Sequence, residues 1–240
     1  RLDGAIAVNA GFLVGHSTLR RTVMGDDAPH REATDDEVAR MVALLRESLA
    51  AGGLGFSSSL DEVHLDGDGH LVPSRAAGFA EYRALASALR DHPGTTLEFI
   101  PAVGEIPRER MDLMADMSLG ANRPLNWNLL GSMSPVEIYE QQLVACDLAR
   151  ERGAKVVALA LPDVLRLRAN RMVADLPGFR DVVTLADDER RAALRDPEVR
   201  ARLRGAVEDA AARGLGAIGK WELIEIAEGR SADTAAYAGK

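Results

Sequence analysis

Hydrophobic positions along the chain alternate between short apolar runs and longer segments with a helical period. The apolar runs predict five strands, and the segments between them predict helices. The predicted strands cover residues 5–14, 54–58, 96–101, 124–128 and 155–160. Strands that alternate with helices are typical of parallel βαβ units, in which the helices cover a sheet. The sequence therefore predicts an α/β protein.

Two stretches carry the spacing of a capping box, in which the first and fourth residues satisfy free backbone N–H groups at a helix start. Thr34 and Glu37 predict a helix that ends before Gly52, and Ser134 and Glu137 predict one that runs to about Arg152. Further helices are predicted over residues 75–90, from Pro107 to near Gly120, from Asp187 and from Asp196.

Two segments are less regular than the rest. Residues 63–72 predict two extended arms around a glycine-rich turn, and residues 216–226 predict a last strand. Five strand–helix units in succession fit either a partial barrel or an open doubly wound sheet. Neither G-x-G-x-x-G after the first strand nor G-x-x-x-x-G-K-[ST] occurs, so nucleotide binding has little support. We therefore expect a partial (β/α) barrel of the TIM type.

Composition narrows the classes of function. Of the 240 residues, 47% are hydrophobic and 28% are charged, a balance typical of globular proteins. Lys and Arg number 29 against 37 Asp and Glu, and the resulting net charge of −8 argues against nucleic-acid binding. No apolar run approaches the roughly 20 residues that span a bilayer, so no membrane segment is expected. The single cysteine fits a reducing compartment, and we expect a cytoplasmic protein.

Candidate chemistry lies at the carboxyl ends of the predicted strands, where barrel enzymes place their active sites. Five residues there are the predicted substrate contacts: His16, Ser58, Glu98, Asn126 and Asn128. If Trp127 packs outward, the two asparagines that flank it face the barrel interior. Structural roles are the alternative, because a histidine beside glycine often bonds a loop backbone and buried amides often satisfy main-chain groups.

Serine and metal chemistry have little local support in the sequence. Residues 57–59 are three serines without a general base nearby and without G-x-S-x-G, so we expect them to line the mouth of the site. The five histidines are scattered, and none pairs at a spacing suited to metal binding. The sequence pattern by itself therefore identifies no catalytic residue and no metal ligand.

The string Leu13-Val14-Gly15-His16-Ser17-Thr18-Leu19-Arg20-Arg21 resembles the amidohydrolase family that includes the D-aminoacylases. The resemblance continues through the helix 41–49 and residues 50–58, and a less-studied branch of the superfamily is similar over residues 97–101 and 123–128. It implies a metal-dependent barrel in which zinc activates a water that attacks an amide carbonyl. The family's early His-x-His is absent here, and Glu98 and the two asparagines stand on the strands where better-known members have histidines.

The resemblance implies that residues 1–240 form the central part of one amidohydrolase barrel domain whose first and last parts lie outside this sequence. It implies hydrolysis of a small-molecule amide, an N-acyl-D-amino acid or a related compound, with zinc held mainly by residues elsewhere. A piece of barrel exposes sheet edges, so a homo-oligomer is possible. Two alternatives stay open: a non-catalytic binding protein on a degenerate barrel, and an unrelated barrel enzyme.

Overall fold

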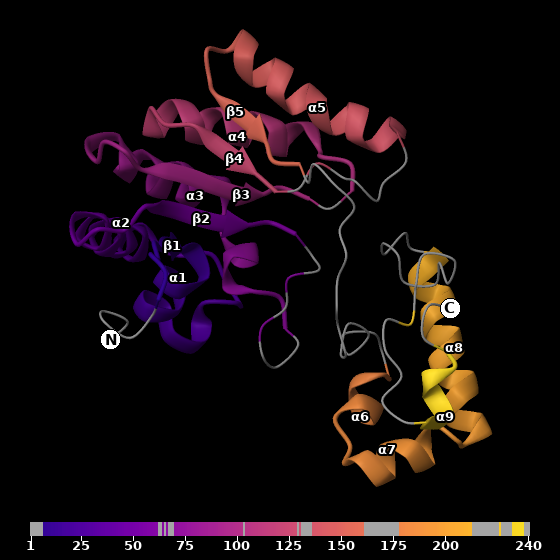
Figure 1. Cartoon of the computed structure of the whole chain (residues 1–240). Coiled ribbons are helices and arrows are strands. Elements are labelled where there is room, and N and C mark those ends of the chain that lie inside the picture. Colours follow the sequence, from indigo (N-terminus) through magenta and orange to yellow (C-terminus); the bar gives the residue numbers. More distant parts are fainter. Residues whose placement is uncertain are drawn as a thin grey trace. The chain divides into compact units, whose positions relative to one another are not determined.

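The computed structural model consists of two compact units, residues 1–162 (unit 1) and residues 163–240 (unit 2), and each is described by itself (Figure 1). The residues that the structure describes are 7–61, 64, 66, 70–102, 104–128, 130, 136–160, 178–212, 226 and 232–237. Whether all 240 residues form a single barrel domain stays a prediction.

Unit 1 is built on a parallel sheet of five strands. The strands are β1 (Leu13–Gly15), β2 (Gly55–Ser59), β3 (Thr96–Ile100), β4 (Leu125–Trp127) and β5 (Val156–Ala158). Each strand pairs with the next one along the chain, in the order β1-β2-β3-β4-β5. A doubly wound sheet reverses its strand order and carries helices on both faces, whereas a barrel adds strands in one direction. The order confirms the predicted arc of a (β/α) barrel.

Helices connect these strands. They are α1 (His16–Met24), α2 (Asp35–Ala50), α3 (Phe79–Ser87), α4 (Arg108–Ala121) and α5 (Val136–Glu151), with 3₁₀ turns at Gly25–Asp27, Pro73–Ala76 and Ala88–Asp91. The helix predicted over residues 75–90 is divided into α3 and the two flanking 3₁₀ turns. The start predicted at Pro107 is confirmed to within one residue. Figure 1 shows α2 to α5 arranged along the sheet.

The first predicted strand was wrong in its length. Among the described residues from 7 onward, the strand covers residues 13–15, and residues 7–12 are irregular, with Val8 and Phe12 exposed. The chain enters α1 at His16, directly after β1, with Gly15 in an extended conformation as the N-cap. His16, Leu19 and Arg20 are buried on one face of that helix, and this three-to-four-residue spacing was the missed indication of a helix.

The start of α2 confirms the first capping box. The Thr34 hydroxyl accepts a hydrogen bond from the Glu37 backbone, and the Glu37 carboxylate accepts one from the Thr34 backbone at 2.8 Å. Both terminal nitrogens of Arg31 also donate to Glu37, each at 2.8 Å. The hydrogen bonds from Arg31, followed by those from Thr34, lower the pKa of Glu37 to about 2. The carboxylate therefore stays charged at the helix N-terminus, where negative charge is favourable.

The core of unit 1 lies between the sheet and the helices. Alternate strand residues Phe56, Leu97, Phe99, Leu125 and Trp127 are all fully buried. They belong to one hydrophobic cluster with residues from α2, α3, α4 and α5, among them Leu45, Leu85, Leu113, Met114 and Ala145. Met111, Met114 and Met117 of α4 are buried in this core as well.

Unit 2 contains four described helices: α6 (Arg180–Val183), α7 (Asp187–Ala193), α8 (Pro197–Ala212) and α9 (Ala232–Ala235). The helices predicted from Asp187 and Asp196 are thus confirmed. The strand predicted over residues 216–226 lies outside the described residues except for Ile226. Half of the arm-turn-arm segment 63–72 also lies outside them, although backbone hydrogen bonds join Asp66 to His70 and Val72 to His64. Among the described helices, none is both long and apolar enough for a membrane span.

Candidate functional site

Of the five predicted substrate contacts, His16 lies in α1, and the other four lie on two different faces of the sheet. Residues that are paired across neighbouring parallel strands share a face, and successive residues alternate. Ser58 is aligned with Phe99, and Phe99 with Trp127, so Ser58 lies on the face covered by the helices. Glu98 is aligned with Asn126 on the opposite face, which we call the inner face because it corresponds to the interior of a barrel.

Four polar side chains of β3, β4 and the residue that follows β4 form two hydrogen-bonded pairs on the inner face, which together we call the polar row: Thr96, Glu98, Asn126 and Asn128. The Asn126 amide donates to the Thr96 hydroxyl at 3.1 Å. The Asn128 amide donates to Oε1 of Glu98 at 2.5 Å. All four side chains are partly exposed, in contrast to the fully buried Leu97, Phe99, Leu125 and Trp127 of the same two strands. The predicted position of the asparagines opposite Trp127 is confirmed.

Glu98 is the charged member of the polar row. Burial raises the pKa of its carboxyl, and the hydrogen bond from Asn128 opposes that rise. Within the part of the chain that the structure describes, Asn128 is the one hydrogen-bond partner of Glu98, and no ion pair of Glu98 is found there. The row therefore presents a partly desolvated carboxylate between two carboxamides, which is suited to groups that donate hydrogen bonds.

His16 and Ser58 belong instead to a buried network behind the sheet. The His16 Nδ1 atom lies 2.8 Å from the Ser58 hydroxyl, and its Nε2 atom lies 2.7 Å from Glu81 Oε1 in α3. A carboxylate only accepts hydrogen bonds, so Nε2 carries the hydrogen and Nδ1 accepts from Ser58. His16 is 1% exposed, and burial lowers its pKa although the contact with Glu81 opposes that shift. The imidazole is therefore neutral at pH 7.

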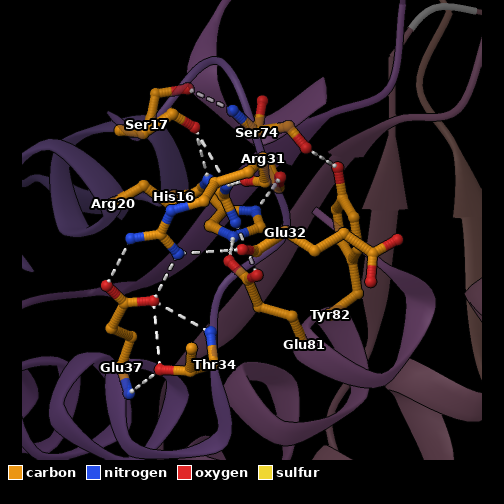
Figure 2. Close-up of polar contacts among 12 residues, drawn as sticks. His16, Ser17, Arg20, Arg31, Glu32, Thr34, Glu37, Ser74, Glu81 and Tyr82 are labelled. Atoms are coloured by element: carbon orange, nitrogen blue, oxygen red, sulfur yellow. Dashed lines mark hydrogen bonds and ion pairs between the residues drawn. The ribbon is translucent and has the colours of Figure 1, made fainter. Parts of the chain in front are cut away.

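Arg20 supplies the positive charge of this network (Figure 2). Its Nη1 atom donates to Glu81 Oε2 at 2.5 Å, and its other nitrogens donate to the backbone carbonyls of Ala28 and Arg31. Burial raises the pKa of Glu81, but the hydrogen bonds from His16 and Arg20 prevail and lower it overall. A buried carboxylate and a buried guanidinium thus neutralise one another, and the pair ties α1 to α3 and to residues 28–31.

Aromatic rings and further hydroxyls surround the network. The ring of Tyr82 meets His16 edge-on at a centroid distance of 4.8 Å, and Phe56 lies at 5.5 Å. The Tyr82 hydroxyl donates to the backbone carbonyl of Ser74 at 2.7 Å, while the Ser74 backbone donates to the Ser17 hydroxyl at 3.1 Å (Figure 2). Because Ser58 and Glu81 bind its two ring nitrogens, both polar atoms of His16 are occupied inside the protein. Substrate contact by His16 or Ser58 stays a prediction.

Sequence reasoning missed Glu81, Arg20 and Thr96. The four-residue spacing of His16 and Arg20 places both on one face of α1, which could have indicated a shared partner. Nothing local identifies that partner as Glu81, because it lies 65 positions beyond His16. The general base that the three serines lack in sequence is present in space as His16, but its imidazole lies in the core behind the sheet.

A metal site is not formed by the described residues. Among them, no group of three or more His, Cys, Asp or Glu side chains has an arrangement that could hold a metal ion. Glu98 is accompanied by amides and a hydroxyl, and asparagine is a poor zinc ligand compared with imidazole. The polar row by itself therefore does not fit a zinc centre.

Comparison with known proteins identifies relatives over most of the chain. The model of the amidohydrolase family matches residues 1–219. An uncharacterized protein of Mycobacterium tuberculosis is 33% identical over 214 residues, a match that covers 70% of this chain and 33% of that protein. The chain thus spans about a third of the length of this relative.

Two solved structures are similar to the chain in fold. The crystal structure of a D-aminoacylase, described as defining a novel subset of amidohydrolases, is 28% identical, with a TM-score of 0.51 over 66% of this chain and 31% of that one. The N-acyl-D-glutamate deacylase of Bordetella bronchiseptica, solved with zinc and a phosphonate inhibitor, is 22% identical, with a TM-score of 0.51 over 68% of this chain and 32% of that one. The second likeness concerns the fold alone.

Proposed function

The chain belongs to the amidohydrolase family, and we propose that the protein cleaves the non-peptide C–N bond of an N-acyl-D-amino acid or a related small amide. The observation that carries the proposal is the polar row on the inner face of the sheet. In (β/α) barrels, catalysis takes place at the carboxyl ends of the strands. Asn128 directly follows β4, and Glu98 lies two residues before the end of β3.

The chemistry of the row supports recognition of an amide. Each carboxamide nitrogen donates a hydrogen bond within the polar row: that of Asn126 to Thr96 and that of Asn128 to Glu98. Among the described residues, no hydrogen bond engages the Oδ1 atoms of these asparagines. These carbonyl oxygens and the Glu98 carboxylate would accept hydrogen bonds from the N–H groups of a bound amide. We therefore assign Glu98, Asn126 and Asn128 to substrate positioning.

The proposal includes a metal cofactor, with zinc as the expected ion. Its support comes from the family and from a solved D-aminoacylase, 28% identical to this chain, whose structure is described as having a binuclear metal centre. Such a bound ion would supply Lewis-acid polarisation of the amide carbonyl and a nucleophilic hydroxide. The described residues do not form its ligand set, so we assign none of the polar row to metal binding.

The test uses the full-length protein and a panel of N-acetyl-D- and N-acetyl-L-amino acids, with bound metal measured by elemental analysis. We expect about one or two zinc ions per chain and amide hydrolysis that is lost on chelation. Asn126→Ala should lower kcat/KM by at least about tenfold, as loss of a substrate hydrogen bond does. Asn9→Ala, at an exposed position before β1, is the matched control and should leave it unchanged. Absence of both metal and turnover would favour the non-catalytic binding protein instead.

A further inference from the structure

The second carboxylate oxygen of Glu98 is the starting point of a further inference. Oε1 accepts the hydrogen bond from Asn128, whereas no interaction of Oε2 is found among the described residues. The side chain is partly exposed on the inner face. One oxygen is thus held in place while the other remains available to a ligand.

The strand positions around Glu98 contain no compensating charge. Ser57 of β2 and Asn126 of β4 are aligned with Glu98 on either side, and Val157 of β5 is aligned with Asn126. The inner-face residues of β3 itself, Thr96 and Ile100, are also neutral. Within the described strands, the inner face therefore carries a single negative charge and no positive one.

A partly desolvated carboxylate without a counter-ion favours a ligand group that donates hydrogen bonds and disfavours a second anion. The raised pKa of Glu98 agrees with this environment, since burial is not offset by a nearby cation. The Oδ1 atoms of Asn126 and Asn128, which accept no hydrogen bond from the described residues, also favour a hydrogen-bond donor, because they too are acceptors.

We propose that Glu98 is a specificity-determining residue that selects N-acyl amino acids whose side chain carries a cationic or N–H-donating group and rejects those with a second carboxylate. The proposal rests on the function proposed above, in which the polar row contacts the substrate. It adds the substrate class: basic and amide side chains are preferred to acidic ones.

N-acetyl-D-glutamine and N-acetyl-D-glutamate form the matched test pair, because they have nearly the same shape and differ in charge. For the full-length protein we expect kcat/KM to favour the glutamine compound by at least about tenfold, as for a like-charge contact in a partly desolvated site. Glu98→Gln should bring this ratio close to one. Glu47→Gln, on the exposed surface of α2, is the control and should keep the wild-type ratio. A wild-type ratio near one, or an unchanged ratio in a folded Glu98→Gln variant, would overturn the proposal.

A second variant and a second measurement keep the inference separate from the proposed hydrolysis. Asn126→Lys adds a cation beside Glu98 and should shift the preference toward the glutamate compound, even if Glu98→Gln fails to fold. Calorimetric binding of N-acetyl-D-arginine and N-acetyl-D-glutamate should show the same order of affinities without turnover. If hydrolysis is absent but the arginine compound binds more tightly in a Glu98-dependent manner, the specificity proposal holds and the enzymatic one fails. If hydrolysis occurs but substitution of Glu98 leaves the substrate preference unchanged, the enzymatic proposal holds and the specificity proposal fails.

Discussion

The Nε2 atom of His16 lies 2.7 Å from Oε1 of Glu81, and the other oxygen of the same carboxylate binds Arg20 at 2.5 Å. Glu81 therefore joins a neutral imidazole and a charged guanidinium in the core, and neither partner has another carboxylate among the described contacts. The side chains of His16 and Arg20 are fully buried, and that of Glu81 is 3% exposed. In a buried, weakly polar environment, the contribution of each of these three side chains to the free energy of unfolding depends on the presence of the other two.

Glu81→Gln tests the buried charge pair. The substitution preserves shape but leaves the Arg20 guanidinium without its counter-ion, and removal of one partner of a buried pair costs about 3–5 kcal/mol. We expect the free energy of unfolding, measured by urea denaturation at pH 7, to fall by this amount. Glu47→Gln on the exposed face of α2 should change it by less than about 0.5 kcal/mol. Equal stabilities of the two variants would show that the pair contributes nothing.

His16 makes stability dependent on pH. Burial depresses its pKa below the ordinary value of 6.5, so the unfolded chain binds a proton near that pH that the folded chain does not bind. The stabilisation is therefore fully present above pH 6.5 and is lost as the pH falls toward the depressed value. Glu81, whose pKa is also lowered, adds a loss of stability below its ordinary value of 4.5.

Denaturation measured between pH 8 and pH 5 should show this loss, and His16→Gln should flatten the curve between pH 6.5 and 5. His30→Gln, at an exposed position, should leave the slope unchanged. A wild-type protein whose stability is constant over this range would contradict the neutral state assigned to His16.

Gly55 tests how closely β2 and β3 approach one another. Its φ angle is +155°, and a Cβ atom built on it overlaps the backbone carbonyl of Thr96. Gly55→Ala should therefore force the two strands apart at the start of β2 and destabilise the protein by about 1–3 kcal/mol, as overpacking does. Gly104→Ala is the matched control, because a Cβ atom there meets nothing within 4 Å. Thermal unfolding of both variants distinguishes a steric effect from a general effect of alanine.

The sequence predicted features with a local cause. Alternation around Trp127 placed Asn126 and Asn128 on one face correctly, because the two-residue period of a strand is fixed by its geometry. The capping box at Thr34 was correct for a similar reason, since all its atoms lie within one helical turn.

Features with a long-range cause could not be predicted. His16 appeared to be a loop residue because Gly15 and Ser17 flank it, and its helical position became clear only from the buried face of α1. Its partners Ser58 and Glu81 lie 42 and 65 positions away, and periodicity carries no information about which distant side chains meet. The same limit applies to Thr96, which holds Asn126 across 30 positions.

Asn128→Ala tests the coupling within the polar row. The hydrogen bond from Asn128 lowers the pKa of Glu98, against burial, which raises it. Its removal should therefore raise the pKa of Glu98 further, so that the carboxylate is neutralised at a higher pH when the solution is acidified. An NMR titration of the Glu98 side-chain carboxyl should detect this shift directly, without any requirement for turnover.

The same shift should affect ligand binding if Glu98 binds cations. Affinity for N-acetyl-D-arginine should begin to fall at a higher pH in Asn128→Ala than in the wild type, because a protonated carboxyl no longer attracts the guanidinium. Asn9→Ala should titrate as the wild type does. A Glu98 pKa that stays the same or falls in Asn128→Ala would show that the Asn128 amide does not stabilise the charged carboxylate. Glu98 would then have to select its ligand without help from Asn128.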